Sequence, residues 1–319
     1  MRVLTGIQPS GDLHIGNYFG SIKQMVDAQE SNQTFAFIAN YHAMTSGGKD
    51  LARLTMQCAT DFLALGIDPQ KSVFWVQSDV KEVLELYWVL SSFTSMGLLE
   101  RAHSYKDKTA KGIAANHSLF SYPVLMAADI LIFGSEVVPV GKDQIQHVEI
   151  ARDIAIRFNN QYGDILTIPE FRVQEEVQTV PGTDGQKMSK SYGNIVNIFG
   201  EEKAQLKNIK KIVTENVAME EPKEYASCNV YNMAKLFLEG ENLIALQERY
   251  KRGGEGHGHF KMYLAEVMWE YFKEFRQKRE YFETHQGEVR DILDMGAARA
   301  KEAALPIIEK IRSVTGIKY

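Results

Sequence analysis

The sequence has little cysteine. Its 319 residues include two, Cys58 and Cys228, far apart along the chain. Two thiols cannot form a four-thiolate zinc site, and they do not amount to a disulfide framework. Because Cys58 falls on the apolar face of a helical pattern, we expect two buried free thiols rather than a disulfide.

Long apolar runs are also absent. No stretch of about eighteen apolar residues without a charge occurs, so the sequence predicts no membrane-spanning helix. The chain starts with a strand pattern and lacks the charged and apolar regions of a signal peptide. We therefore expect a cytoplasmic protein with no membrane partner.

Positive charge is not in excess either. The formal net charge is -5 at pH 7, which argues against a protein that coats nucleic acid indiscriminately but leaves room for a local basic face. Lys203, Lys207 and Lys211 recur every four residues and would form one stripe on a helix. A phosphate-binding stripe and a solvated helix face are about equally good interpretations of this spacing.

Four short apolar runs alternate with helical patterns in the first part of the chain. Such runs are typical of buried parallel strands, joined by crossover helices that cover both faces of a sheet. We therefore predict an α/β fold with a doubly wound parallel sheet of the Rossmann type. The expected strands are 3–5, 34–39, 72–77 and 137–141, with helices over 51–65 and near 83–93.

The pattern then changes. A polar, lysine-rich stretch at about 98–118 is expected to be an insertion or a mobile loop, after which a helix begins at Tyr122 and Pro123. Residues 163–186 have the composition of a loop, and from about 200 onward only helical patterns remain, including 236–250, 260–275 and 289–311. Since the chain is longer than a usual single domain, we expect two domains. These are a Rossmann-type catalytic domain over 1–195 and an all-helical domain over 196–319.

The first strand leads into a glycine-rich loop, residues 6–11, then His14-Ile15-Gly16-Asn17 and a helix. Glycine lets a ligand approach the backbone closely. His14 and Asn17 would share one face of the helix, at an end whose free N–H groups favour anions. Any one of these features could be an ordinary polar helix start, but together they predict a phosphate site.

A second segment of this kind, Lys187-Met188-Ser189-Lys190-Ser191, lies at the other end of the expected sheet domain. By itself such a segment is usually solvated surface. A topological switch point can bring it together with the first loop, so that the two segments hold a triphosphate between them. The P-loop sequence GxxxxGK[ST] is absent, which leaves this as the predicted route to phosphate binding.

HIGN at 14–17 and KMSKS at 187–191 resemble the two signature sequences of class I aminoacyl-tRNA synthetases. GxQPSG at 6–11 and VPVGxDQxQH at 138–147 resemble the bacterial tryptophanyl-tRNA synthetases in particular, and the similarity covers essentially the whole chain. The resemblance implies activation of L-tryptophan by ATP, accompanied by Mg2+, to tryptophanyl-adenylate and pyrophosphate. It further implies transfer of tryptophan to the 3′-terminal adenosine of tRNA(Trp), a helical domain that reads the anticodon, and a homodimer.

The same resemblance implies the residues that bind ATP. His14, Asn17, Lys187 and Lys190 would be the catalytic residues around the triphosphate, and the loop at 187–191 would close on pyrophosphate. Gly141, Lys142 and Asp143 would hold the ribose, although many relatives carry Glu in place of Lys142, and Val180 would contact adenine. The full set is Gln8, Pro9, Ser10, Gly16, Asn17, Gly141, Lys142, Asp143, Val180, Lys187, Met188, Ser189, Lys190 and Ser191.

Asp129 is a carboxylate in an otherwise apolar helical segment. Without the family, a structural ion pair or helix contact is its favoured interpretation. The resemblance instead implies that it accepts the indole N–H, with Met126 against the ring. Phenylalanine would leave the carboxylate unpaired, which explains discrimination without an editing domain. The implied tryptophan site also includes Tyr122 and Gln144 at the amino group, and His42, Val138 and Val140.

Three other functions stay open at this point. A tyrosyl enzyme shares the fold and needs an acidic group against a phenolic hydroxyl, but Asn17 and the GxQPSG sequence favour the tryptophan branch. A small-substrate nucleotidyltransferase has a similar His loop but needs no helical tail. The third alternative is a catalytically silent tRNA-binding paralogue, and the intact His14, Lys187 and Lys190 argue against it.

We expect no metal site at His257 and His259, because two ligands fall short of the usual three or four. The three tryptophans are expected in the core: Trp75, Trp88 and Trp269.

Overall fold

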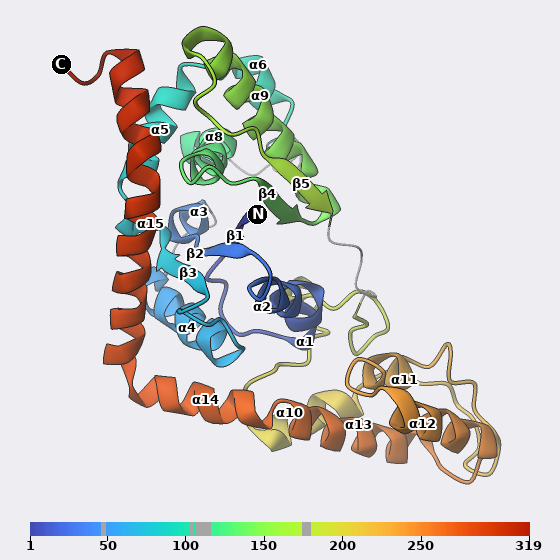
Figure 1. The fold of residues 1–319 in the computed structure, drawn as a ribbon. Helices are drawn as coiled ribbons and strands as arrows, with labels where there is room; N and C mark the ends of the chain where they lie inside the picture. Colours follow the sequence, from blue (N-terminus) through green and yellow to red (C-terminus); the bar gives the residue numbers. More distant parts are fainter. Residues whose placement is uncertain (46–48, 103–104, 106–115, 174–179) are drawn as a thin grey trace.

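The computed structural model describes residues 1–45, 49–102, 105, 116–173 and 180–319, apart from the side chain of Asp143. Five parallel strands form one sheet in the order β3-β2-β1-β4-β5 (Figure 1). This order, with its reversal between β1 and β4, confirms the doubly wound fold. The strands are β1 (Arg2–Ile7), β2 (Gln33–Ile38), β3 (Ser72–Val76), β4 (Val137–Val140) and β5 (Glu170–Val173).

Side chains of the central strands alternate between two apolar cores. Phe35 and Phe37 of β2 belong to one core, whereas Ala36 and Ile38 belong to the other. β2 and β3 are therefore buried on both faces, which is why their sequences are continuous apolar runs rather than alternating ones. One face carries α1 (Ile15–Asn17), η1 (Tyr18–Ile22), α2 (Lys23–Ala28) and α4 (Leu51–Ala64), and the other α5 (Glu82–Ser91), α6 (Met96–Glu100), α8 (His117–Leu131) and α9 (Ile145–Tyr162).

Short elements follow several strands directly. They are α3 (Asn40–Met44) after β2, η2 (Gln77–Asp79) after β3 and η3 (Lys142–Gln144) after β4. Because they begin where parallel strands end, their first residues lie at the carboxyl edge of the sheet. A further short element, η4 (Lys190–Tyr192), follows no strand directly.

Two boundaries in the middle of the chain were predicted wrongly. The loop expected over 163–186 contains β5, whose residues are mostly exposed at the edge of the sheet and so leave no apolar run. Helix α8 begins at His117, not at Tyr122 and Pro123, because the Asn116 side chain accepts a hydrogen bond from the Leu119 N–H at 2.9 Å and caps it. Most of the expected insertion, 103–104 and 106–115, lies outside the described residues.

Beyond residue 200 the described chain is helical, as predicted, and contains no strand. The pattern at 260–275 is two helices rather than one, separated at Phe272, and the helix expected from 236 begins at Gly240. The elements are α10 (Glu202–Lys210), α11 (Asn229–Ala234), α12 (Gly240–Arg252), α13 (His257–Tyr271), α14 (Lys273–Thr284) and α15 (Gln286–Thr315). The domain division at 195/196 stays a prediction.

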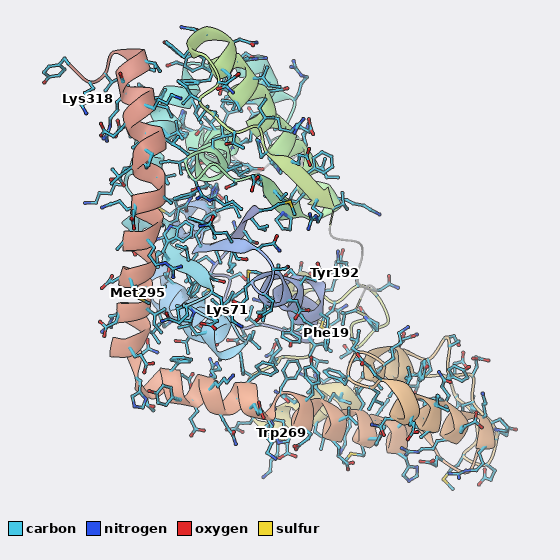
Figure 2. All side chains as sticks on the ribbon, in the orientation of Figure 1. Phe19, Lys71, Tyr192, Trp269, Met295 and Lys318 are labelled. Carbon is cyan, nitrogen blue, oxygen red and sulfur yellow. The ribbon has the colours of Figure 1, made fainter. Side chains whose placement is uncertain are left out.

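The last helix returns to the sheet. In Figure 1, α14 and α13 lead away from the sheet toward α11 and α12, whereas α15 runs beside β3 and α5. Gly296 makes this approach possible, because a Cβ there would lie 1.8 Å from the Phe74 carbonyl oxygen of β3. Figure 2 marks Phe19, whose ring packs 5.2 Å from Phe237 and 5.8 Å from Tyr271 between centroids. The helix after the first loop therefore shares a core with the C-terminal helices.

Cys58 and Cys228 are free and buried, as predicted. The prediction that all three tryptophans are core residues is wrong for Trp88, which is 74% exposed on α5, whereas Trp75 is 1% exposed. Trp269 is half-buried on α13. Among the described helices, none has the length and apolarity needed to cross a membrane.

Candidate active site

A cavity of about 650 Å3 opens at the carboxyl ends of β1 and β4. Its walls include Gly6 and Ile7 from β1, and Val138 and Val140 from β4. These two strands are neighbours in the sheet, and the strand order reverses between them. The cavity therefore lies where a doubly wound sheet is expected to bind its ligand.

Many of the predicted site residues meet in this cavity. From the ATP set, the cavity wall includes Gln8, Ser10, Asn17 and Gly141, and from the tryptophan set it includes His42, Tyr122, Met126, Asp129, Val138, Val140 and Gln144. The remaining described candidates lie off this wall: Pro9, His14, Gly16, Lys142, Val180, Lys187, Met188, Ser189, Lys190 and Ser191. The side chain of Asp143 is outside the description.

The two basic segments contact one another, as the switch-point argument predicts. The Lys190 Nζ donates to the Ser10 carbonyl oxygen at 2.8 Å and lies 3.4 Å from the Ser10 Oγ. Behind them, the Ile15 N–H donates to the Val196 carbonyl and the Ile198 N–H donates to the Leu13 carbonyl, both at 3.0 Å. Segments some 180 residues apart in sequence are thus joined at one edge of the cavity.

His14 is a buried, neutral imidazole. It is 6% exposed, and its Nδ1 has no hydrogen-bond partner among the described residues. Burial, together with the nearby charge of Lys190, lowers the pKa of His14 to about 4. Its backbone N–H donates to the Asn17 Oδ1 at 3.1 Å, which fixes the start of the helix. His14 therefore offers a neutral ring, and the positive charge comes from lysine.

The loop that carries residues 187–191 is held by Asn194, a residue that is 2% exposed. The Asn194 Nδ2 donates to the Asp184 Oδ1 at 2.8 Å and to the Lys187 carbonyl at 3.1 Å, and its Oδ1 accepts from the Ser189 N–H at 2.8 Å. The Met188 N–H donates to the Val180 carbonyl at 3.0 Å. These bonds give the loop a defined shape beside the cavity.

Asp129 is 2% exposed on the cavity wall. The Gln77 Nε2 lies 2.9 Å and 2.8 Å from its two oxygens, and the His42 Nε2 lies 2.8 Å from the Asp129 Oδ2. Among the described residues no lysine or arginine pairs with it, and the structural contact anticipated without the family is the one to the His42 ring. Gln77 was missed in the sequence, where it closes the predicted strand 72–77.

Tyr122 is a second polar group on the cavity wall, two turns before Asp129 on α8. The Tyr122 hydroxyl and the His147 Nε2 are hydrogen-bonded, and the rings of Tyr122 and His42 meet edge to face with centroids 6.2 Å apart. Gln144, at the end of η3, also lines the cavity. The cavity thus combines apolar walls with polar groups at a few positions, which is the usual composition of a small-molecule site.

A family model described as tRNA synthetases class I (W and Y) matches residues 1–275. A tryptophan–tRNA ligase from Campylobacter jejuni strain RM1221 is 61% identical over 319 residues, covering 99% of this chain and 100% of that protein. The chain belongs to the bacterial tryptophanyl-tRNA synthetases of class I. A tryptophan–tRNA ligase from Rhodopirellula baltica is 47% identical and covers 100% of both chains.

Solved structures agree. The tryptophanyl-tRNA synthetase of Campylobacter jejuni, complexed with ADP and tryptophan, has a TM-score of 0.96 and 62% identity, covering 99% of this chain and 100% of that one. The tyrosyl-tRNA synthetase of Archaeoglobus fulgidus, at 19% identity and a TM-score of 0.64, shares the fold. This chain is therefore an aminoacyl-tRNA ligase, which confirms the family and excludes a small-substrate nucleotidyltransferase. The roles of the individual residues stay predictions.

Proposed function

We propose that this chain is a tryptophan–tRNA ligase that binds L-tryptophan and ATP in the cavity between β1 and β4. The observation that carries the proposal is the buried Asp129 carboxylate on the wall of this cavity. A ligand that has no N–H or O–H at that position leaves unused the acceptor capacity of the carboxylate that faces the cavity, and it forgoes a hydrogen bond to a charged group in a buried site. A relative at 62% identity is complexed with ADP and tryptophan.

The reaction has two steps. The carboxylate of tryptophan attacks the α-phosphorus of ATP, and the bond from that phosphorus to pyrophosphate breaks. A ribose hydroxyl of the 3′-terminal adenosine of tRNA(Trp) then attacks the carbonyl carbon of the adenylate, and AMP leaves. Neither step needs a covalent enzyme intermediate, so the chain contributes positioning and neutralisation of charge.

The triphosphate would be held by the two basic segments. Lys187 and Lys190 supply the positive charge, Ser189 and Ser191 supply hydroxyl groups, and the neutral His14 ring and Asn17 lie at the helix start. No group of three or more histidines, cysteines or acids that could hold a metal occurs among the described residues. Mg2+ therefore fits here as part of the nucleotide substrate, bound through phosphates and water rather than in a protein cage.

The rest of ATP and of tryptophan would occupy opposite walls of the cavity. We propose ribose contacts from Gly141, Lys142 and Asp143, and adenine contact at Val180. Tyr122 and Gln144 would hold the amino group of tryptophan, and Met126 would pack against its ring. His42 would act through Asp129, to which its Nε2 lies 2.8 Å away.

The helical region 196–319 would bind tRNA(Trp) and read its anticodon. Lys203, Lys207 and Lys211 are exposed on and just after α10, where they are accessible to the phosphates of tRNA. We also propose a cytoplasmic homodimer. The exposed Trp88 on α5 supports a protein partner at that face, because large exposed aromatic groups are concentrated at interfaces.

The test is amino-acid-dependent ATP–pyrophosphate exchange with tryptophan, tyrosine and phenylalanine. We expect exchange with tryptophan alone, and a fall of about a hundredfold in Asp129→Ala, because a hydrogen bond to a charged group is lost. Asp153→Ala removes an exposed carboxylate on α9 and is the control. Exchange with tyrosine would indicate a tyrosyl enzyme, and no exchange with any of the three would leave a tRNA-binding paralogue.

A further inference from the structure

Gln77 is a fully buried amide directly behind the Asp129 carboxylate. It begins η2 at the carboxyl end of β3, is 1% exposed, and is not on the cavity wall. Its Nε2 approaches both Asp129 oxygens, at 2.9 Å and 2.8 Å. Gln77 therefore contacts the carboxylate that we assign to the indole without itself reaching a ligand.

The orientation of this amide is determined by a second contact. The Gln77 Oε1 accepts the backbone N–H of Tyr41 at 3.0 Å, so its Nε2 must face Asp129. A flipped amide would bring two N–H donors together at Tyr41 and set an oxygen against the carboxylate. The ends of β2 and β3 are also joined here, since the Asn40 side chain exchanges hydrogen bonds with Ser78 at 2.9 Å and 3.2 Å.

A carboxylate at the end of a short side chain turns freely about its last bond unless neighbours fix it. Gln77 contacts both oxygens from behind, and His42 contacts the Oδ2 alone, at 2.8 Å. In a buried site these charge-assisted bonds are strong, because little water competes for them. Asp129 is thereby held in one orientation at the cavity.

We propose that Gln77 is a specificity-determining positioning residue, which aims the Asp129 carboxylate at the indole N–H of tryptophan. The inference rests on the proposed role of Asp129. Without Gln77 the carboxylate keeps its place on α8 but not its orientation, so the indole N–H loses its aligned acceptor. Recognition of the N–H should weaken, whereas binding of the ring, the amino group and ATP should not.

The test compares tryptophan with benzothienylalanine, an analogue in which sulfur replaces the indole N–H and removes the donor. The readout is the ratio of kcat/KM for the two amino acids in ATP–pyrophosphate exchange. In Gln77→Met, which keeps the length of the side chain, we expect this preference for tryptophan to fall about tenfold. The change should appear in KM for tryptophan, with KM for ATP unchanged.

Gln29→Met is the matched control. Gln29 is also buried, donates to the Gly66 carbonyl at 2.8 Å and accepts from the Asp68 N–H at 3.0 Å, but it is not on the cavity wall and does not contact Asp129. Loss of its amide should lower thermal stability and leave the preference intact. If Gln77→Met does not fold, Gln77→Glu keeps the shape and sets a carboxylate against Asp129, and the preference should fall further.

The Asp129→Ala variant distinguishes the proposed positioning role of Gln77 from the proposed role of Asp129 in binding the indole N–H. Loss of the preference in Asp129→Ala, with the wild-type preference kept in Gln77→Met and in Gln77→Glu, would overturn the role of Gln77 alone. A preference unchanged in Asp129→Ala would overturn the assignment of the indole to Asp129, and the positioning role with it. A reduced preference in both the Gln77 and Asp129 variants, with Gln29→Met unaffected, would support the inference.

Discussion

His14 combines the position expected for a phosphate ligand with an uncharged ring. Burial and the Lys190 charge lower its pKa to about 4, so the imidazole is neutral at physiological pH. A neutral ring can donate one N–H to a phosphate oxygen without adding to the charge of the lysines. The sequence suggested that His14 belongs at this site, but its protonation state depends on burial that only packing determines.

The lowered pKa of His14 predicts a loss of stability in acid. Between about pH 6.5 and pH 4 the unfolded chain binds a proton at His14 that the folded chain does not, so the free energy of unfolding falls as pH falls. Burial raises the pKa of Asp61 to about 6, which has the opposite sign in an overlapping range. The effect must therefore be measured as the difference between wild type and His14→Gln.

Urea unfolding of both proteins at about pH 7.5 and about pH 5 provides this difference. We expect the wild type to lose about 2 kcal/mol more than His14→Gln over the interval, less than the full linkage because pH 5 lies above the folded pKa of about 4. Equal losses in the two proteins would show that His14 titrates normally.

At the scale of elements, the 180–194 loop depends on one amide. Asn194 bonds the Asp184 carboxylate, the Lys187 carbonyl and the Ser189 N–H. Asn194→Ala should raise KM for ATP and lower kcat of pyrophosphate exchange about tenfold, because the lysines lose their fixed positions. Gly182→Ala should act similarly, since a Cβ there would lie 2.2 Å from the Asn194 Nδ2.

Asn159 provides the control for this loop. Its amide closes the turn after α9 in the same way, donating to the Leu166 carbonyl at 2.8 Å and accepting from the Leu166 N–H at 2.9 Å, away from the cavity. Asn159→Ala should lower the melting temperature with little effect on KM for ATP. Equal kinetic effects of Asn194→Ala and Asn159→Ala would mean that Asn194 is only structural.

The contact of α15 with β3 depends on Gly296. A Cβ there would lie 1.8 Å from a backbone oxygen of Phe74, which cannot move aside as a flexible side chain would. Gly296→Ala should destabilise the protein by about 2 kcal/mol or more, because overpacking forces the helix off the sheet. Gly287→Ala, on the same helix with nothing within 4 Å of the added Cβ, should change stability by less than about 1 kcal/mol. Chemical denaturation of both variants provides the comparison.

The elements that could be predicted from the sequence are those with a local signal. Four strands have apolar runs, and their alternation with helices indicates the topology. Strand β5 carries Glu170 and Arg172 at an exposed edge, so its pairing with β4 and not its composition makes it a strand. The start of α8 was obscured because His117 and Ser118 have the polar character of the preceding stretch.

At the scale of the whole molecule, the candidate site was predictable as far as the switch-point rule and the family motifs extend. That rule correctly predicted that the first loop lies next to the segment that contains Lys190. It could not indicate that Gln77 and His42 converge on Asp129, because these contacts span 52 and 87 residues and depend on side-chain packing. Nor could it place α15 beside α5, where Arg312 pairs with Glu85 across 227 residues.

Trp88 is the basis for a prediction about assembly. Trp88 is 74% exposed on α5, and Leu84, one turn earlier on the same helix face, is 39% exposed. Covering this pair with a second copy of the chain would remove apolar surface from water, and a charge at its centre would be buried unpaired. Trp88→Glu should therefore convert the proposed homodimer to a monomer in sedimentation equilibrium. Ile244→Glu, 58% exposed on α12, should leave the dimer intact, and a Trp88→Glu protein that sediments like the wild type would place the interface on another face.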